Sequence, residues 1–250
     1  MNSIAKKSAW LIPFVMCSHF IHAQFYTHRY EAGICAGTFV YQGDLTPSDI
    51  GSYQTIAPNI GFFAARILNR LFSVRANFTF GKLKGDDALY AKPEYRRQRN
   101  FNFSTPVAEF SGALVWNILA KNGIEQPKGF SPYLFAGAGV SLLHISRNWS
   151  NYNAEYFNSE SVSAGLAADI AHRTPNAAII LPAGVGIKYA LTPQLSLAAE
   201  TSYRFMFTDY LDGFSQAANP AKKDNYYGHS IGLIFSLGYK DRYDCPVVSK

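Results

Sequence analysis

The sequence predicts an all-β fold, an eight-stranded antiparallel up-and-down transmembrane β-barrel of the outer-membrane type, from three observations. The 250 residues are 15% aromatic and only 16% charged, whereas globular domains carry about 25% charged residues. Long segments alternate between apolar and polar side chains, as expected of strands with one face in lipid and one in a polar interior. The connections between these segments alternate between short and long, which is typical of outer-membrane barrels.

Composition excludes several other classes of protein. The chain holds 19 Phe and 16 Tyr, and such an aromatic content is incompatible with intrinsic disorder. After the first two dozen residues, no segment approaches the ~18 consecutive apolar residues of a membrane-spanning helix. Three cysteines are too few for a disulfide scaffold. The modest positive charge, without a basic run with interleaved aromatic residues, gives no indication of a nucleic-acid partner.

Residues 1–23 are predicted to be a signal peptide. The segment begins with Lys6 and Lys7, continues with a short apolar stretch and ends at the small residue Ala23, which is the order of charge, apolar centre and cleavage site in exported proteins. A transmembrane anchor is the alternative, but the apolar stretch is short and contains Pro13. Cleavage removes the two lysines and lowers the formal net charge from +6 to about +4.

The barrel domain is predicted to span residues 24–240, followed by a periplasmic tail at 241–250. The clearest alternation occurs at 72–80, 195–207 and 229–239. These segments are longer than the ~5–6 residues of ordinary strands and match the ~9–11 residues that cross a bilayer at a tilt. The eight predicted strands are 30–41, 56–67, 72–80, 101–118, 132–146, 177–191, 195–207 and 229–239.

One parity of the strands is predicted to face lipid and the other a narrow lumen. Trp116, Tyr133, Tyr189 and Tyr239 are expected to form belts at the membrane interfaces. An eight-stranded lumen is too narrow for a water channel, and charges buried in it must pair. We therefore predict a salt-bridged plug, with transport as the alternative. The predicted lumen charges are Glu31, Arg75, Glu109, Lys188, Glu200 and Arg204.

No catalytic, cofactor or metal site is predicted. Residues 228–232 spell G-x-S-x-G, but a hydrolase elbow needs a following helix and a later histidine, and the sequence continues as a strand. The pair Asp209 and Asp212 lies in a predicted loop, where solvated carboxylates are favoured over calcium. The basic run at 92–99 is expected to be solvated, with lipopolysaccharide phosphates or a protein as alternative partners.

Two cysteines remain after removal of the signal peptide. Cys35 is placed inside the first strand, on the lumen parity, and Cys245 beyond the last strand. An intramolecular bridge would require the tail to fold back into the lumen. In an oxidising compartment an exposed cysteine suggests an intermolecular disulfide, and an unpaired thiol stays the alternative.

Several short segments resemble the PorG-like family of small outer-membrane barrels associated with type IX secretion. The last predicted strand also resembles the terminal signal by which such barrels are recognised for membrane insertion (230–237). The segments that carry the family resemblance are Glu31-Ala32-Gly33, Tyr41-Gln42-Gly43-Asp44-Leu45, Thr208-Asp209-Tyr210-Leu211-Asp212 and Arg242-Tyr243-Asp244-Cys245-Pro246.

The resemblance implies a non-enzymatic component of a protein-secretion assembly in the outer membrane, which anchors or positions a periplasmic ring. The implied partners are outer-membrane lipids, the ring lipoprotein and the ring subunit, with a possible disulfide through Cys245. The implied contact residues are Arg242, Tyr243, Cys245 and Pro246, and the turn at 121–130 is a second candidate surface. The alternative is a free-standing barrel for surface adhesion or minor pore activity, acting through the aromatic loop 147–176.

Overall fold

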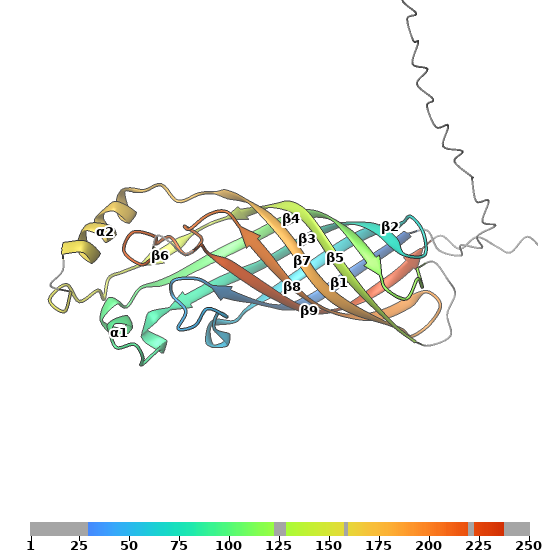
Figure 1. Cartoon of the computed structure of the whole chain (residues 1–250), viewed down its shortest axis with the longest axis horizontal. Coiled ribbons are helices and arrows are strands. Elements are labelled where there is room, and N and C mark those ends of the chain that lie inside the picture. Colours follow the sequence, from blue (N-terminus) through green and yellow to red (C-terminus); the bar gives the residue numbers. More distant parts are fainter. Residues whose placement is uncertain (1–29, 123–128, 158–159, 220–222, 238–250) are drawn as a thin grey trace, which may run out of the picture.

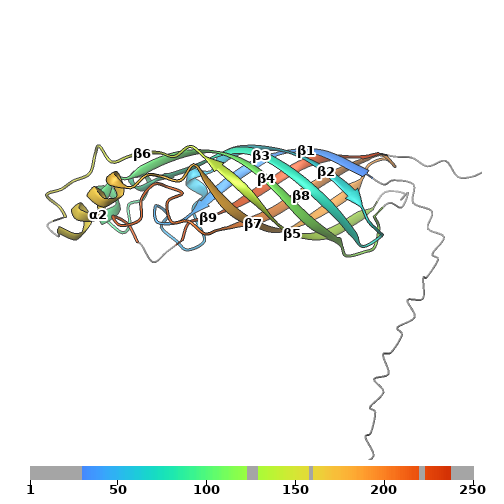
Figure 2. The same cartoon turned by 90° about the horizontal axis from the view of Figure 1, so that it is seen from above.

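The chain forms a closed antiparallel β-barrel of eight long strands (Figures 1 and 2). The computed structural model describes residues 30–122, 129–157, 160–219 and 223–237. The fold class predicted from the sequence is therefore confirmed. The long strands are β1 (Tyr30–Gln42), β2 (Ala57–Ile67), β3 (Phe72–Asp86), β4 (Asn102–Asn117), β5 (Phe130–Leu143), β7 (Ala177–Ala190), β8 (Leu195–Met206) and β9 (Asn225–Leu237).

Every long strand pairs with its neighbour in the sequence, and the first strand pairs with the last. The β1–β9 ladder closes the barrel and runs from Tyr30 opposite Leu237 to Gln42 opposite Asn225. A short strand, β6 (Ser146–Asn148), extends the sheet by pairing with the start of β4. Closure leaves no long strand with an unpaired edge, which is the condition for a sheet to exist in hydrocarbon.

The two ends of the barrel differ in the length of their connections (Figure 1). Short links join β2 to β3 and β7 to β8, and β1 starts and β9 ends on the same side. The long connections at the opposite end carry two 3-10 turns, η1 (Tyr53–Thr55) and η2 (Asp87–Leu89), and two helices, α1 (Tyr95–Arg99) and α2 (Glu160–Ala171). We call these the periplasmic end and the outer end, because outer-membrane barrels place their long loops outside the cell.

Large apolar side chains cover the outside of the barrel. Phe62, Phe78, Phe110, Val185 and Ile231 are each about half exposed or more, whereas their sequence neighbours point into the lumen. Such a continuous apolar exterior requires a hydrocarbon environment. None of the helices in the described part of the chain is long and apolar enough to cross a membrane.

The loops of the outer end fold over the barrel and build an apolar core of their own. We call the segments 43–56, 87–101, 144–176 and 207–224 the outer cap. Phe101 from one cap loop stacks on Phe214 from another at 4.3 Å between ring centroids, and both are fully buried. The same cluster includes Leu45, Leu166 and other side chains from the strand ends. The cap therefore closes the outer mouth of the barrel.

Two strands extend further than their hydrophobic patterns predict, and one aromatic residue faces the other way. β3 continues to Asp86 rather than ending at residue 80, and β9 begins at Asn225 rather than at 229. Tyr133, assigned to the membrane interface from the sequence, is 1% exposed inside the lumen. This assignment was wrong because Tyr133 shares the inward parity of Phe135, and the hydroxyl binds a lumen carboxylate.

Candidate functional site

The six charged residues predicted for the lumen form three ion pairs at successive levels of the barrel. Lys188 pairs with Glu31 near the periplasmic end, and Arg75 pairs with Glu200 further inside. The third pair, between Arg204 and Glu109, lies next to the outer cap. Three bases meet three acids, so the lumen is charge-neutral, as buried ions require.

The middle pair is supported by two rings. Both nitrogens of the Arg75 guanidinium donate to the two oxygens of Glu200, one of them over 3.3 Å. The hydroxyl of Tyr133 donates to Oε1 of Glu200 over 2.6 Å. The guanidinium also lies over the Phe135 ring, 4.5 Å from its centroid. A bidentate, ring-stacked arginine of this kind holds one fixed geometry.

The upper pair repeats this arrangement. Nη2 of Arg204 lies 3.2 Å from Oε2 of Glu109, and the hydroxyl of Tyr226 donates to the other oxygen of the same carboxylate. The Arg204 guanidinium lies 5.0 Å from the centroid of the Phe39 ring. A tyrosine, an arginine and a ring therefore surround each of the two inner carboxylates.

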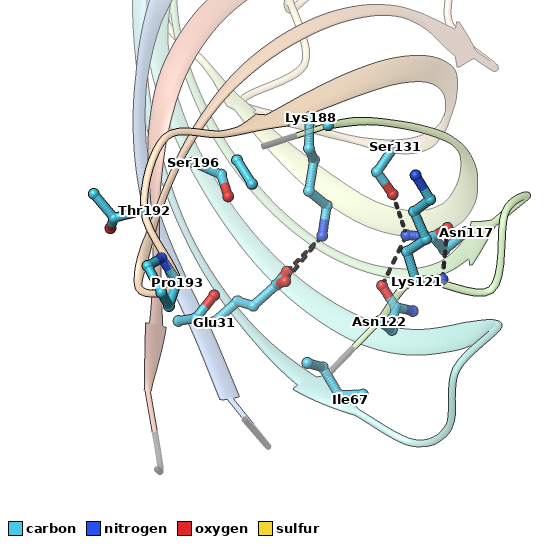
Figure 3. A pocket seen from close by; sticks show the side chains of 13 residues that line it. Glu31, Ile67, Asn117, Lys121, Asn122, Ser131, Lys188, Thr192, Pro193 and Ser196 are labelled. Atoms are coloured by element: carbon cyan, nitrogen blue, oxygen red, sulfur yellow. Dashed lines mark hydrogen bonds and ion pairs between the residues drawn. The ribbon is translucent and has the colours of Figure 1, made fainter. Parts of the chain in front are cut away.

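The periplasmic mouth holds a small polar cavity (Figure 3). Lys188 and Glu31 reach toward each other across it, with Nζ 2.8 Å from Oε2. On the opposite wall the side-chain amide of Asn117 donates to Oδ1 of Asn122 and to the hydroxyl of Ser131. The cavity measures about 70 Å³, which is room for a few water molecules.

A second cavity of about 50 Å³ lies deeper in the lumen, between the two inner ion pairs. Its lining includes the thiol-bearing Cys35, together with Arg75, Glu200 and Arg204. Cavities of this size hold isolated waters rather than a water column. The described part of the lumen is therefore filled at the level of Arg75 and Glu200.

The basic run at 92–99 is not the solvated stretch expected from the sequence. Arg96 and Arg99 are buried and both bind the fully buried carboxylate of Asp87, at 2.9 Å and 2.6 Å. They also donate to the backbone carbonyls of Asp44 and Thr46. The two arginines thus tie two cap loops together, because buried guanidinium groups need several acceptors.

A buried acidic cluster joins three parts of the outer cap. The hydroxyl of Tyr41 lies 2.8 Å from Oδ2 of Asp212 and 2.5 Å from Oδ1 of Asp224. Burial raises the pKa of both carboxyl groups well above the ordinary value, and the negative charges of Asp44 and of each other add to the shift. The expectation that Asp212 is solvated was wrong. Among the described residues no group of His, Cys, Asp or Glu is arranged to hold a metal ion.

The aromatic residues of loop 147–176 are mostly used inside the cap. Trp149 packs edge-on against Phe214, and Tyr152 lies 5.9 Å from Phe101 between ring centroids. Tyr156 stays exposed. Little of the sticky surface expected from the sequence is therefore offered to a ligand.

The predicted partner-contact residues fall outside the described part of the chain. This applies to the signal peptide, to most of the 121–130 turn and to the tail with Arg242, Tyr243, Cys245 and Pro246. Residues 228–232 lie within β9, so the G-x-S-x-G sequence forms a strand and lacks the strand-to-helix turn of a hydrolase.

Sequence reasoning missed the tyrosines that complete these clusters. Tyr41, Tyr133 and Tyr226 each bind carboxyl groups from distant strands or loops. Their inward parity was readable, because each lies an even number of residues from another inward-facing position. Their partners were not readable, since the relative rotation of the strands decides which side chains meet.

Strand pairing and an apolar exterior define the class of protein, a small β-barrel of the outer-membrane type. A family model described as "Domain of unknown function (DUF6089)" matches residues 6–236. The chain belongs to this family. It is also similar to "Uncharacterized protein RP788" of Rickettsia prowazekii (strain Madrid E), with 31% identity over 141 residues, covering 50% of this chain and 72% of the relative.

Solved structures with similar folds are all small outer-membrane barrels of low sequence identity. The attachment invasion locus protein Ail of Yersinia pestis, in complex with a heparin analogue, aligns with a TM-score of 0.44 and 12% identity over 84% of this chain and 99% of Ail. Neisserial surface protein A gives 0.43 and 15%, over 83% and 97%. OprG of Pseudomonas aeruginosa gives 0.43 and 10%, over 84% and 97%.

Proposed function

We propose that this chain is a non-enzymatic outer-membrane component of a protein-secretion assembly of the type IX kind, where it anchors or positions a periplasmic ring. The resemblance to the PorG-like family supplies the identity of the assembly. The observation that supports an anchoring rather than a conducting role is the sealed lumen, in which Arg75, Glu200 and Tyr133 fill the cross-section between two small cavities.

Sealing leaves the two ends of the barrel as the surfaces available to partners. The outer end is covered by its own cap, with Asp87 and two arginines holding the loops. A periplasmic partner would therefore meet the short turns, the polar mouth around Lys188 and Glu31, and the tail that carries Cys245. On this proposal the protein-conducting channel is a different and larger barrel.

Co-purification from native envelopes tests the proposal. The full chain, with an affinity tag in an outer loop, is extracted in mild detergent and its partners are identified by mass spectrometry. We expect the ring lipoprotein and the ring subunit in stoichiometric amounts, and loss of secretion when the gene is deleted. Recovery of the barrel without ring proteins, from cells that secrete normally without it, contradicts the proposal.

The covalent part of the proposal has its own test. Non-reducing gels of envelopes are expected to show a heavier species that Cys245→Ser removes and reducing agent dissolves. Cys35→Ser is the matched control, because Cys35 lies inside the lumen and lines the deeper cavity. A heavier species that depends on Cys35, or a single monomer band in every variant, rules out the disulfide through Cys245.

A further inference from the structure

Charge is almost absent from the outward-facing side chains of the eight long strands. Within the described strands, the outward positions that carry an ammonium, guanidinium or carboxylate are Arg66 on β2 and Lys82, Lys84 and Asp86 on β3. Arg66 lies near the periplasmic end, opposite Tyr30. The two lysines lie toward the outer end of β3 and alternate with the inward-facing Leu83.

The position of Lys82 coincides with the outer boundary of the membrane. Phe72 pairs in register with Trp116 at the periplasmic end, and both outward rings fit an interface belt. From Phe72 to Lys82 the strand advances ten residues, about 33 Å at ~3.3 Å per residue. A strand tilted by about 40° then rises about 25 Å along the membrane normal, which is the height of the apolar band.

The surface below the lysines is aromatic and the surface beside them is hydroxylated. Phe78 and Phe110 pack together at 4.7 Å between ring centroids, and Phe80 is 49% exposed directly below Lys82 on the same face. Lys84 lies opposite Ser104 of β4, and Ser104 lies opposite Ser146 of β6. An apolar floor, two cations and two hydroxyls thus follow one another outward across β3, β4 and β6.

The two lysines carry charge that the described residues do not neutralise. No carboxylate of the described chain lies within 4.0 Å of either ammonium, whereas five other cationic side chains form ion pairs. The nearest outward acid, Asp86, accepts a hydrogen bond from the backbone N–H of Ala88 over 2.9 Å and caps η2. Cations at a lipid boundary without a protein counter-ion attract anionic headgroups.

We propose that Lys82 and Lys84 form a docking site for a phosphate group of lipopolysaccharide, the phosphorylated glycolipid of the outer leaflet. Its acyl chains would lie on the rings of Phe78, Phe80 and Phe110, its phosphate between the two ammonium groups, and its sugar hydroxyls against Ser104 and Ser146. Charge complementarity and continuity with the apolar exterior select this occupant. The site is separate from the basic run at 92–99, whose arginines are buried in the cap.

Lipid titration of the purified full chain tests the assignment. Binding of bis-phosphorylated lipid A and of the same lipid with its phosphates removed is measured by native mass spectrometry. The variant Lys82→Gln/Lys84→Gln is expected to bind phosphorylated lipid about thirtyfold more weakly, since two lysines at an anionic surface contribute about that factor. Arg66→Gln, an outward cation at the other interface, is the matched control and is expected to leave binding unchanged.

Three further readouts keep the test decisive. Lys82→Arg/Lys84→Arg retains the charge and is expected to retain binding, which separates lost charge from a folding defect. Inorganic phosphate is expected not to displace the glycolipid at equal concentration, because it lacks the acyl contacts. Equal binding of dephosphorylated lipid by the unaltered chain, or full binding by the glutamine variant, overturns the proposal and leaves the ring-anchoring role untouched.

Discussion

Tyr41 and Asp212 are 171 residues apart in the sequence and are joined by a hydrogen bond of 2.8 Å inside the outer cap. The same phenol oxygen lies 2.5 Å from Asp224. A phenol has a single proton to donate, so both short contacts are hydrogen bonds only when one of the two carboxyl groups is protonated. Two segments that carry the family resemblance, 41–45 and 208–212, therefore meet in a structural lock on the outer end.

The lock makes the cap sensitive to pH. Since the pKa of Asp212 and of Asp224 is raised above the ordinary aspartate value of 3.8, their contribution to stability is complete at acidic pH and is lost as the pH rises through the folded-state pKa. Limited proteolysis or amide exchange of 207–219 is expected to accelerate between acidic and alkaline pH. Neighbouring Asp44 and Asp209 strengthen this repulsion, and Arg99 opposes it.

Asp224→Asn is expected to abolish most of this pH dependence. The amide keeps an oxygen for the N–H of Leu211, which Asp224 accepts over 3.0 Å, and it removes the second negative charge. Glu94→Gln, an exposed carboxylate in the neighbouring cap loop, is the control and should behave as the unaltered chain. A cap that opens equally at every pH in all three proteins contradicts the shared-proton arrangement.

The middle ion pair of the lumen is expected to dominate stability. Glu200→Gln leaves the Arg75 guanidinium buried without its counter-ion, and loss of one partner of a buried pair costs about 3–5 kcal/mol in the free energy of unfolding. Urea unfolding in detergent, followed by heat-modifiable mobility on gels, measures the loss. Glu31→Gln should cost less, because the Lys188–Glu31 pair lines the water-accessible mouth cavity. An equal loss in both variants counts against this ranking.

The same pair is expected to hold the lumen closed to ions. In planar bilayers the unaltered barrel should be silent or nearly so, because its cavities measure only about 70 and 50 Å³. Arg75→Ala/Glu200→Ala removes both long side chains without leaving a lone charge, and should add a small conductance. Phe80→Ala, which trims a lipid-facing ring on the same strand as Arg75, is the control. Steady channels in the unaltered protein would refute the sealed lumen.

Strand number, strand order and the inward-facing charges could be predicted because each depends on local alternation. The pattern failed where the surroundings of a strand changed. β3 continues past residue 80 to Asp86, but its outward residues there are Lys82 and Lys84 instead of rings, so the apolar alternation stops at the membrane boundary while the strand continues. An end of hydrophobic periodicity therefore marked the end of the lipid layer rather than the end of the strand.

The outer cap was largely out of reach of sequence reasoning. Arg96, Arg99 and Asp212 look like solvated loop residues, since charge is usually exposed. Their burial depends on contacts with loops more than 40 residues away, such as the backbone carbonyl of Asp44 for both arginines. α2 lies within a segment read as an irregular loop. Its register with the other cap loops is set by tertiary packing, which no local pattern encodes.

The seam that closes the barrel depends on the absence of a side chain at Gly37. This residue lies opposite Ser230 in the β1–β9 ladder, and a Cβ atom placed there would lie 1.8 Å from the backbone carbonyl oxygen of His229. Backbone cannot move aside as a flexible side chain can. Gly37→Ala is therefore expected to lower the free energy of unfolding by about 1–3 kcal/mol, the range of overpacked positions, and to weaken strand closure.

Gly112 on β4 supplies the matched control for this last prediction. A Cβ at Gly112 would meet nothing within 4 Å, so Gly112→Ala removes unfolded-state freedom without a clash and should leave stability unchanged or slightly raised. Urea midpoints in detergent and the fraction of heat-modifiable folded band compare the two variants. Equal behaviour of both alanine variants would show that β1 and β9 can separate enough to admit a methyl group, and the close approach at Gly37 would then not determine closure.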